Sequence, residues 1–198
     1  MNYPDMSSLP QPLHALVEAE LQPGERITWL GQPIPSRMAR STLPVVLFGI
    51  PWTAFALFWT AGAAWGTSQM EGGPGLFSAF PLFGVPFILI GFGMLSSPFW
   101  ASRKARRSAY VLTDQRALVF AAGWRGSVTV RSFEPERLND LRRKQHPDGS
   151  GDLVFTLDAR CDGEGHTRAT DVGFLAVRDV RNVEALVRAL IQRRTSSV

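Results

Sequence analysis

Charge is almost absent from the middle of this sequence. Between Ser41 and Ser102 the only charged side chain is Glu71, whereas an ordinary soluble domain carries a charge every few residues. This absence argues against a water-facing surface for the whole block. It predicts instead that the segment is surrounded by lipid.

Cysteine is also nearly absent, since Cys161 is alone. A single cysteine excludes an intramolecular disulfide and is consistent with a reducing compartment. The first forty residues are mixed, slightly acidic and interrupted by prolines. They lack the basic start and immediate apolar run of a secretory signal, so we expect no signal peptide.

Two long apolar runs occupy the uncharged block, at residues 41–66 and 76–100. Each has about 25 residues, and roughly 20 are enough for a helix to cross a bilayer. Because backbone groups in lipid must be satisfied internally, the runs predict a hairpin of two transmembrane helices. Prolines are tolerated in such helices, and we expect kinks near Pro51 and Pro86. Two buried core helices of a soluble protein are the less favoured alternative.

The flanks of the runs are basic, while the connection at 67–75 has no Lys or Arg. By the positive-inside rule, both termini are therefore expected in the cytoplasm. The flanking cations are candidates for contact with an anionic leaflet: Arg37, Arg40, Arg103, Lys104, Arg106 and Arg107. Four glycines could allow the helices to approach closely, although ordinary membrane-helix composition is the preferred explanation: Gly49, Gly62, Gly91 and Gly93.

The rest of the chain is expected to form a cytoplasmic N-terminal segment (1–40), a basic linker (101–109) and a soluble domain (108–198). The first contains an amphipathic helix over 9–22, which could lie on the membrane or on the soluble domain, and a strand-like stretch over 26–30, which could add a strand to the domain's sheet. Alternating patterns in the soluble domain predict strands near 109–113, 116–122, 127–133, 138–144, 152–159 and 166–172. A final helix begins after Asp179, with an apolar stripe of Val180, Val183, Leu186, Val187, Leu190 and Ile191. An α+β fold with an antiparallel barrel or sandwich capped by this helix is expected.

Short motifs in these segments resemble bacterial pleckstrin-homology-like (PH-like) membrane proteins with two transmembrane helices. They are GERITWLGQP before the spans, the Y-x-L-T-x-x-R run after them, DGSGDLVF, and VGF ahead of the final helix. The most specific run consists of Tyr110, Leu112, Thr113, Asp114 and Arg116. The resemblance implies a PH-like barrel in a bacterial inner membrane. Eukaryotic relatives grip phosphoinositides with a multiply basic loop, but here the matching 113–116 connection is short and singly basic, so that activity is not expected.

No pattern in the sequence predicts catalysis, a cofactor, a metal site or nucleic-acid binding. The Cys161, Asp162, Glu164 and His166 cluster lacks the second ligand pair of a zinc site and is better explained as a hairpin turn. Asp148 to Asp152 lacks the long loop and final Glu of a calcium site. The run 142–144 is basic without interleaved aromatics, which disfavours a nucleic-acid surface.

The expected function is therefore a membrane-anchored interaction module. Its PH-like domain would bind a protein partner, or a second copy of itself, without catalysis. The alternative is a small transporter or channel subunit that assembles through the hairpin. Against this alternative, neither run contains an ionisable residue, although substrate pathways through membranes usually show one.

Overall fold

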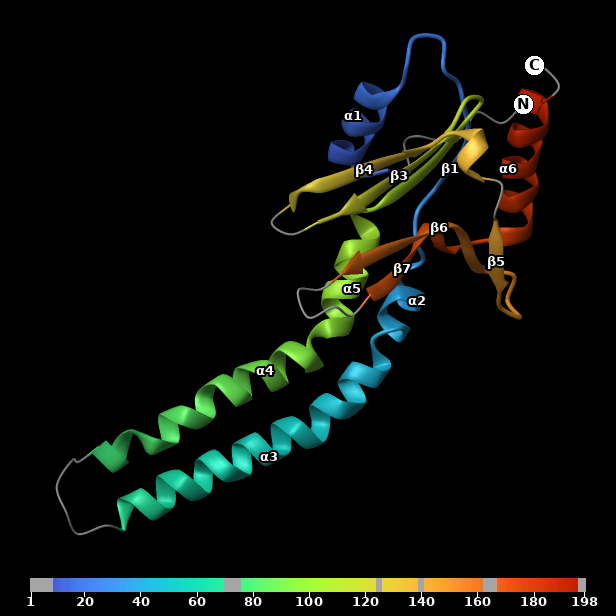
Figure 1. Ribbon diagram of the computed structural model, residues 1–198. Coiled ribbons are helices and arrows are strands. Elements are labelled where there is room, and N and C mark those ends of the chain that lie inside the picture. The colour runs from blue at the N-terminus through green and yellow to red at the C-terminus, as the bar shows by residue number, and fades with distance from the viewer. Residues whose placement is uncertain (1–8, 70–75, 124–125, 139–140, 162–166, 196–198) are drawn as a thin grey trace. The chain divides into compact units, whose positions relative to one another are not determined.

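A computed structural model describes residues 9–69, 76–123, 126–138, 141–161 and 167–195. The chain is α+β with antiparallel sheets (Figure 1). It divides into two units: an apolar unit of residues 38–102, and a domain formed by residues 1–37 and 103–198 together. Each unit is described by itself.

The domain elements follow the chain in this order: α1 (Gln11–Glu20), β1 (Ile27–Gly31), β2 (Ala109–Thr113), β3 (Ala117–Ala122), β4 (Val128–Phe133), η4 (Pro135–Leu138), β5 (Arg142–Gln145), β6 (Gly151–Cys161), β7 (Thr167–Val177) and α6 (Val180–Thr195). The apolar unit holds α3 (Leu43–Ser68), η2 (Leu76–Gly84) and α4 (Val85–Leu95). The boundaries between units fall within α2 (Pro35–Arg40) and α5 (Ser97–Arg106).

The strands form two antiparallel sheets. Sheet A has the order β1-β2-β3-β4, and sheet B has the order β5-β6-β7. Among the strands that the structure describes, no ladder joins the two sheets, so the expected barrel is not closed. Just after β1, the Ile34 amide donates to the Ala176 carbonyl of β7 at 2.8 Å.

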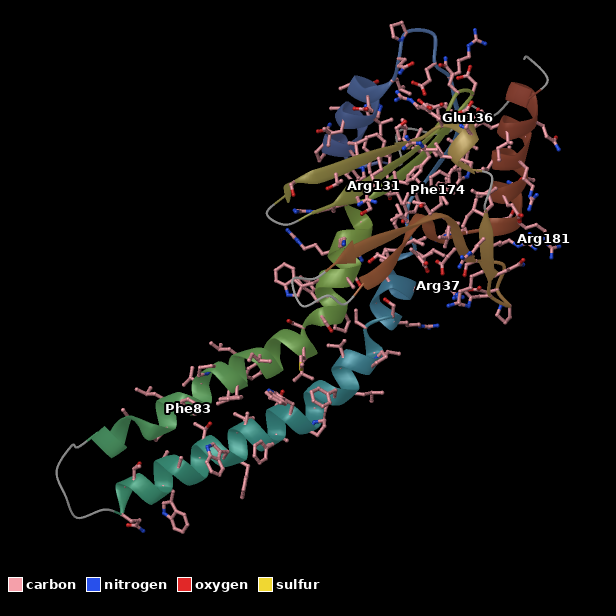
Figure 2. All side chains as sticks on the ribbon, viewed as in Figure 1. Arg37, Phe83, Arg131, Glu136, Phe174 and Arg181 are labelled. Carbon is pink, nitrogen blue, oxygen red and sulfur yellow. The ribbon has the colours of Figure 1, made fainter. Side chains whose placement is uncertain are left out.

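Both faces of sheet A are covered, which explains why every residue of β2 is buried. One face packs against sheet B and α6. Phe174 is at the centre of this main core, with ring centroids 5.3 Å from Trp29, 5.1 Å from Tyr110 and 4.7 Å from Phe155 (Figure 2). On the other face, α1 forms a second, smaller core, whose buried members are Leu9, Leu13, Val17, Ala109, Val111, Leu118 and Phe120.

The final helix follows the sequence prediction closely. The Asp179 carboxylate accepts from the Asn182 amide at 3.4 Å, as an N-cap does. Val180, Val183, Val187 and Leu190 of the predicted stripe are buried in the main core, while Leu186 and Ile191 are half-buried against it. α6 therefore uses this stripe to cover the core between the sheets.

Several boundaries differ from the expected ones. The domain includes α1 and β1, so a unit that begins at residue 108 leaves out part of sheet A and the whole second core. β5 begins at Arg142, because Pro135–Leu138 forms a short 3-10 helix where a strand start was expected. β7 extends to Val177, five residues beyond the expected end at 172, since its last residues pair with the start of β6.

The apolar unit contains one helix long and apolar enough to cross a membrane, α3, and a second candidate in which two helices meet at a bend. α3 continues through Pro51 as one helix. The second run is not one helix. It changes from 3-10 to α-helix at Val85 and bends by 47° between Leu95 and Ser97, because Pro86 and Pro98 favour first-turn positions and disrupt helix interiors.

Glycines determine how α3 packs against η2 and α4. A Cβ on Gly91 would lie 2.3 Å from the Thr53 hydroxyl, and one on Gly84 would lie 1.9 Å from the Thr60 hydroxyl. Gly49 is similarly close to Met94, at 2.9 Å. Gly62 and Gly93 have no such neighbour within 4 Å. Close packing thus explains two of the four predicted glycines and one, Gly84, that was not singled out.

Candidate functional sites: the motif network and the basic junction

The Y-x-L-T-x-x-R motif forms the hairpin between β2 and β3. The Thr113 hydroxyl accepts from the amides of Gln115 (3.2 Å) and Arg116 (3.0 Å), which shapes the turn. Its proton is donated to Glu25 at 2.7 Å. Tyr110 and Leu112 are buried in the main core, and burial raises the pKa of the Tyr110 hydroxyl to about 12.

Arg116 and Glu25 form a bidentate ion pair next to this turn. The Arg116 Nε donates to Glu25 Oε1 at 2.9 Å, and its terminal nitrogen donates to Oε2 at 3.0 Å. The Glu25 side chain is fully buried and that of Arg116 is 13% exposed. Burial alone would raise the pKa of Glu25, but hydrogen bonds from Arg116, the Gln22 amide and Thr113 together lower it. The pair with Glu25 raises the pKa of Arg116.

Asp114 links the motif to the N-terminal segment through two hydrogen bonds with the backbone of Arg26. Its carboxylate accepts from the Arg26 amide at 2.9 Å, and its own amide donates to the Arg26 carbonyl at 3.0 Å. The motif residues therefore attach the N-terminal segment to sheet A. Arg116, the single basic residue of this connection, is held by the Glu25 carboxylate.

The predicted membrane-contact cations fall into two groups. Arg37 forms an ion pair with Asp148, in the β5–β6 turn, so its charge is compensated within the domain. That pair lowers the pKa of Asp148. Arg40 is exposed. The remaining four are exposed at the end of α5, and none forms an ion pair within the described residues: Arg103, Lys104, Arg106 and Arg107.

The α5 cations are fixed to sheet A through Ser108, which is buried. Its hydroxyl donates to the Lys104 carbonyl at 3.0 Å and accepts from the Ala122 amide, at the end of β3, at 3.1 Å. From the other connection, the Gln32 side chain donates to the carbonyls of Arg106 and Ser108 at 3.5 and 3.4 Å. We call residues 103–108, with Gln32, the basic junction. Its cations project from a helix end that favours positive charge.

A groove in the domain adjoins the basic junction. It has a volume of about 290 Å³, and it is lined by Pro10, Pro12, Leu13, Leu16, Arg107, Ala122, Gly123, Gly126, Ser127 and Val128. A larger groove of about 610 Å³ lies within the apolar unit, where Trp52, Phe55, Trp59, Phe83 and Phe87 supply aromatic walls. At this groove, the indole nitrogen of Trp52 donates a hydrogen bond to the Phe87 carbonyl at 3.1 Å.

The carboxylate oxygens of the DGSGD turn (148–152) accept hydrogen bonds from within the domain. Asp148 accepts from the Ser150 amide and hydroxyl as well as from Arg37, and Asp152 accepts from the Ala176 amide at 2.7 Å. The predicted turn at 161–165 lies largely outside the described residues. Within those residues, no group of three His, Cys, Asp or Glu could hold a metal.

Sequence reasoning identified the motif and the cations but missed two residues that organise them. Glu25 lies 88 residues before Thr113, and its only sequence signal is a lone acid ahead of a strand-like segment. Ser108 carries no signal beyond its place between a basic helix end and a strand. In comparisons with known proteins, no family model, curated protein or solved structure matches this chain.

Proposed function

We propose that the chain is a membrane-anchored interaction module. In this proposal, α3 forms one transmembrane span and the bent α4–α5 segment, with η2, forms the second. The domain and both termini are on the cytoplasmic side of a bacterial inner membrane. No catalytic step is assigned to it.

The observation that carries the anchoring proposal is the exposure of large apolar side chains around α3 and α4. Phe58 is 78% exposed, Trp65 72%, Leu47 67% and Leu89 65%. Only 17% of the most apolar stretch of α3 is buried, whereas the core helix of a soluble protein is mostly buried. Since exposed apolar patches of this extent are rare on soluble monomers, lipid is the solvent that suits the unit.

Seven described strands in two sheets, with α6 over the core between them, support a PH-like domain. In the part of the chain that the structure describes, β5 pairs only with β6, so no strand pairs with its other edge. All four of its residues are exposed. Because Arg142 and Lys144 make this edge basic, we assign β5 as the surface for an acidic protein segment.

Membrane extraction tests the anchor. Membranes from cells that express the full chain should retain it in alkaline carbonate and in urea and release it only in detergent, because the apolar unit is held by lipid. Recovery of the protein in the carbonate supernatant would contradict the anchor.

Purification in mild detergent tests the partner surface. The variant Arg142→Glu/Lys144→Glu should lose its co-purifying protein or its self-association. The variant Arg181→Glu/Arg193→Glu carries the same charge change at exposed positions of α6 and should retain them. Equal retention by both variants would remove β5 as the binding edge.

A further inference from the structure

The groove beside the basic junction is located at a defined end of sheet A. Gly31, the last residue of β1, pairs with Tyr110 near the start of β2. Both chain connections to the apolar unit therefore leave the domain from this end. Ala122 pairs with Val128, so the β3–β4 turn that borders the groove is at the same end. The β2–β3 turn with Arg116 is at the opposite end.

A short stretch of chain connects this end to the apolar unit. The apolar unit ends at Ser102, and Arg107, which lines the groove, follows within little more than one helical turn. The Ser108 hydrogen bonds to Lys104 and Ala122 fix this part of α5 to the groove wall. If the apolar unit is anchored in a bilayer, the short covalent connection keeps Arg107, and the groove that it lines, within reach of the bilayer surface.

The lining of the groove is suited to a lipid. Pro10, Pro12 and the 39% exposed Leu16 provide an apolar wall from α1. Two prolines at the start of this helix remove amides that would otherwise need a partner, and its first turn has no acidic residue. Among the described residues that line the groove, Arg107 is the single charged one. An apolar wall beside one cation matches the acyl-glycerol part and the phosphate of a phospholipid.

We propose that this groove binds one anionic phospholipid from the leaflet that holds the anchor. The lipid's glycerol and upper acyl chain lie along α1, and its phosphate pairs with Arg107. This proposal rests on the proposed membrane anchoring. It gives α1 a role at the membrane surface in addition to its packing on sheet A (Figure 1).

The test uses the full chain with Cys161→Ser, reconstituted in nanodiscs and labelled with a fluorophore at a single introduced cysteine. Leu16→Cys reports on the groove. Pro23→Cys is the matched control, because Pro23 is exposed in the loop after the other end of α1. The quenchers are phosphatidylglycerol and phosphatidylcholine, each with a nitroxide on its acyl chain.

Phosphatidylglycerol should quench the label at residue 16 more strongly than phosphatidylcholine does, and it should quench the label at residue 23 weakly. Arg107→Glu should reduce the preference for phosphatidylglycerol about fivefold or more, since one basic side chain contributes about that factor to anionic-lipid binding. Arg181→Glu makes the same charge change on the exposed face of α6 and should leave the preference unchanged.

The possible failures are distinguishable. Insertion of the protein into nanodiscs with equal quenching at residues 16 and 23 would overturn the groove proposal and leave the anchor intact. A preference that is lost equally in Arg107→Glu and Arg181→Glu would show general charge attraction and would also overturn it. Failure to insert would overturn the anchoring proposal, and the lipid proposal with it.

Discussion

At the residue scale, the motif that suggested a family resemblance has a structural explanation. Thr113, Asp114 and Arg116 each bond the N-terminal segment, and Tyr110 and Leu112 fill the main core. The sequence indicated these residues as a group, because their spacing is local. It could not indicate Glu25, since a single acid among polar residues has no pattern that points to a partner so distant in the chain.

Replacement of Glu25 tests this explanation. Glu25→Gln should destabilise the domain by about 3 kcal/mol, because it leaves Arg116 without its charge partner in a largely buried position. The free energy of unfolding in detergent, measured by denaturant titration, checks this value. Glu18→Gln is the control, since Glu18 is 56% exposed in its pair with His14 and should cost less than about 1 kcal/mol. Equal effects of the two variants would contradict the buried role of Glu25.

The pH dependence of stability follows from the lowered pKa of Glu25. A carboxyl with a folded-state pKa below its unfolded value stabilises the fold above the unfolded pKa, and this stability is lost as pH falls through the folded pKa. Acid titration of wild-type stability should therefore show a loss below the ordinary Glu range. This loss should be smaller in Glu25→Gln, and an unchanged profile would contradict the assignment.

At the element scale, local patterns predicted most strands and the final helix. Alternation indicated β2, β3 and β4, and the stripe and N-cap of α6 are present as expected. The predicted bounds are wrong where pairing with another strand, or the position of a proline within a helical turn, determines where an element ends. The length of β7 depends on pairing with β6, and the interruptions at Val85 and Ser97 depend on how the prolines sit within each turn.

Two glycines of α4 provide a matched pair for testing helix packing. A side chain at Gly91 would collide with Thr53, while Gly93 faces open space. Gly91→Leu should therefore destabilise the packing of α3 on α4 by about 1–3 kcal/mol, which is the usual cost of overpacking. Gly93→Leu should have little effect. Unfolding in SDS titration, followed by tryptophan fluorescence, measures both, and equal stabilities would contradict the close approach at Gly91.

At the scale of the whole molecule, the main difference from expectation is that the domain is built from two chain segments. The apolar unit is inserted between β1 and β2. Sequence reasoning placed the domain after the apolar runs, because the later segment alone shows repeated strand patterns. The sequence left open whether the strand-like stretch 26–30 joins the sheet and whether the first helix lies on the domain. The pairing of β1 with β2 and the burial of α1 against sheet A decide both.

Two fragments test this organisation. A chain that joins residues 9–37 to 103–198 through a short Gly/Ser linker should be soluble and should unfold cooperatively. Residues 108–198 alone should be less stable and prone to aggregation, because Val111, Leu118 and Phe120 lose their cover. Thermal unfolding by circular dichroism compares them, and equal stability would contradict the role of the N-terminal segment.

The central proposal is a membrane hairpin with the domain on the cytoplasmic side, and thiol labelling in intact cells tests it most directly. A cysteine replaces Gly73 in a Cys161→Ser chain, and a second variant carries its cysteine at Pro23 instead. A membrane-impermeant maleimide should label residue 73 in intact cells and residue 23 only after lysis, because the positive flanks keep the domain inside. Labelling of residue 23 in intact cells, or of residue 73 only after lysis, would contradict the proposal.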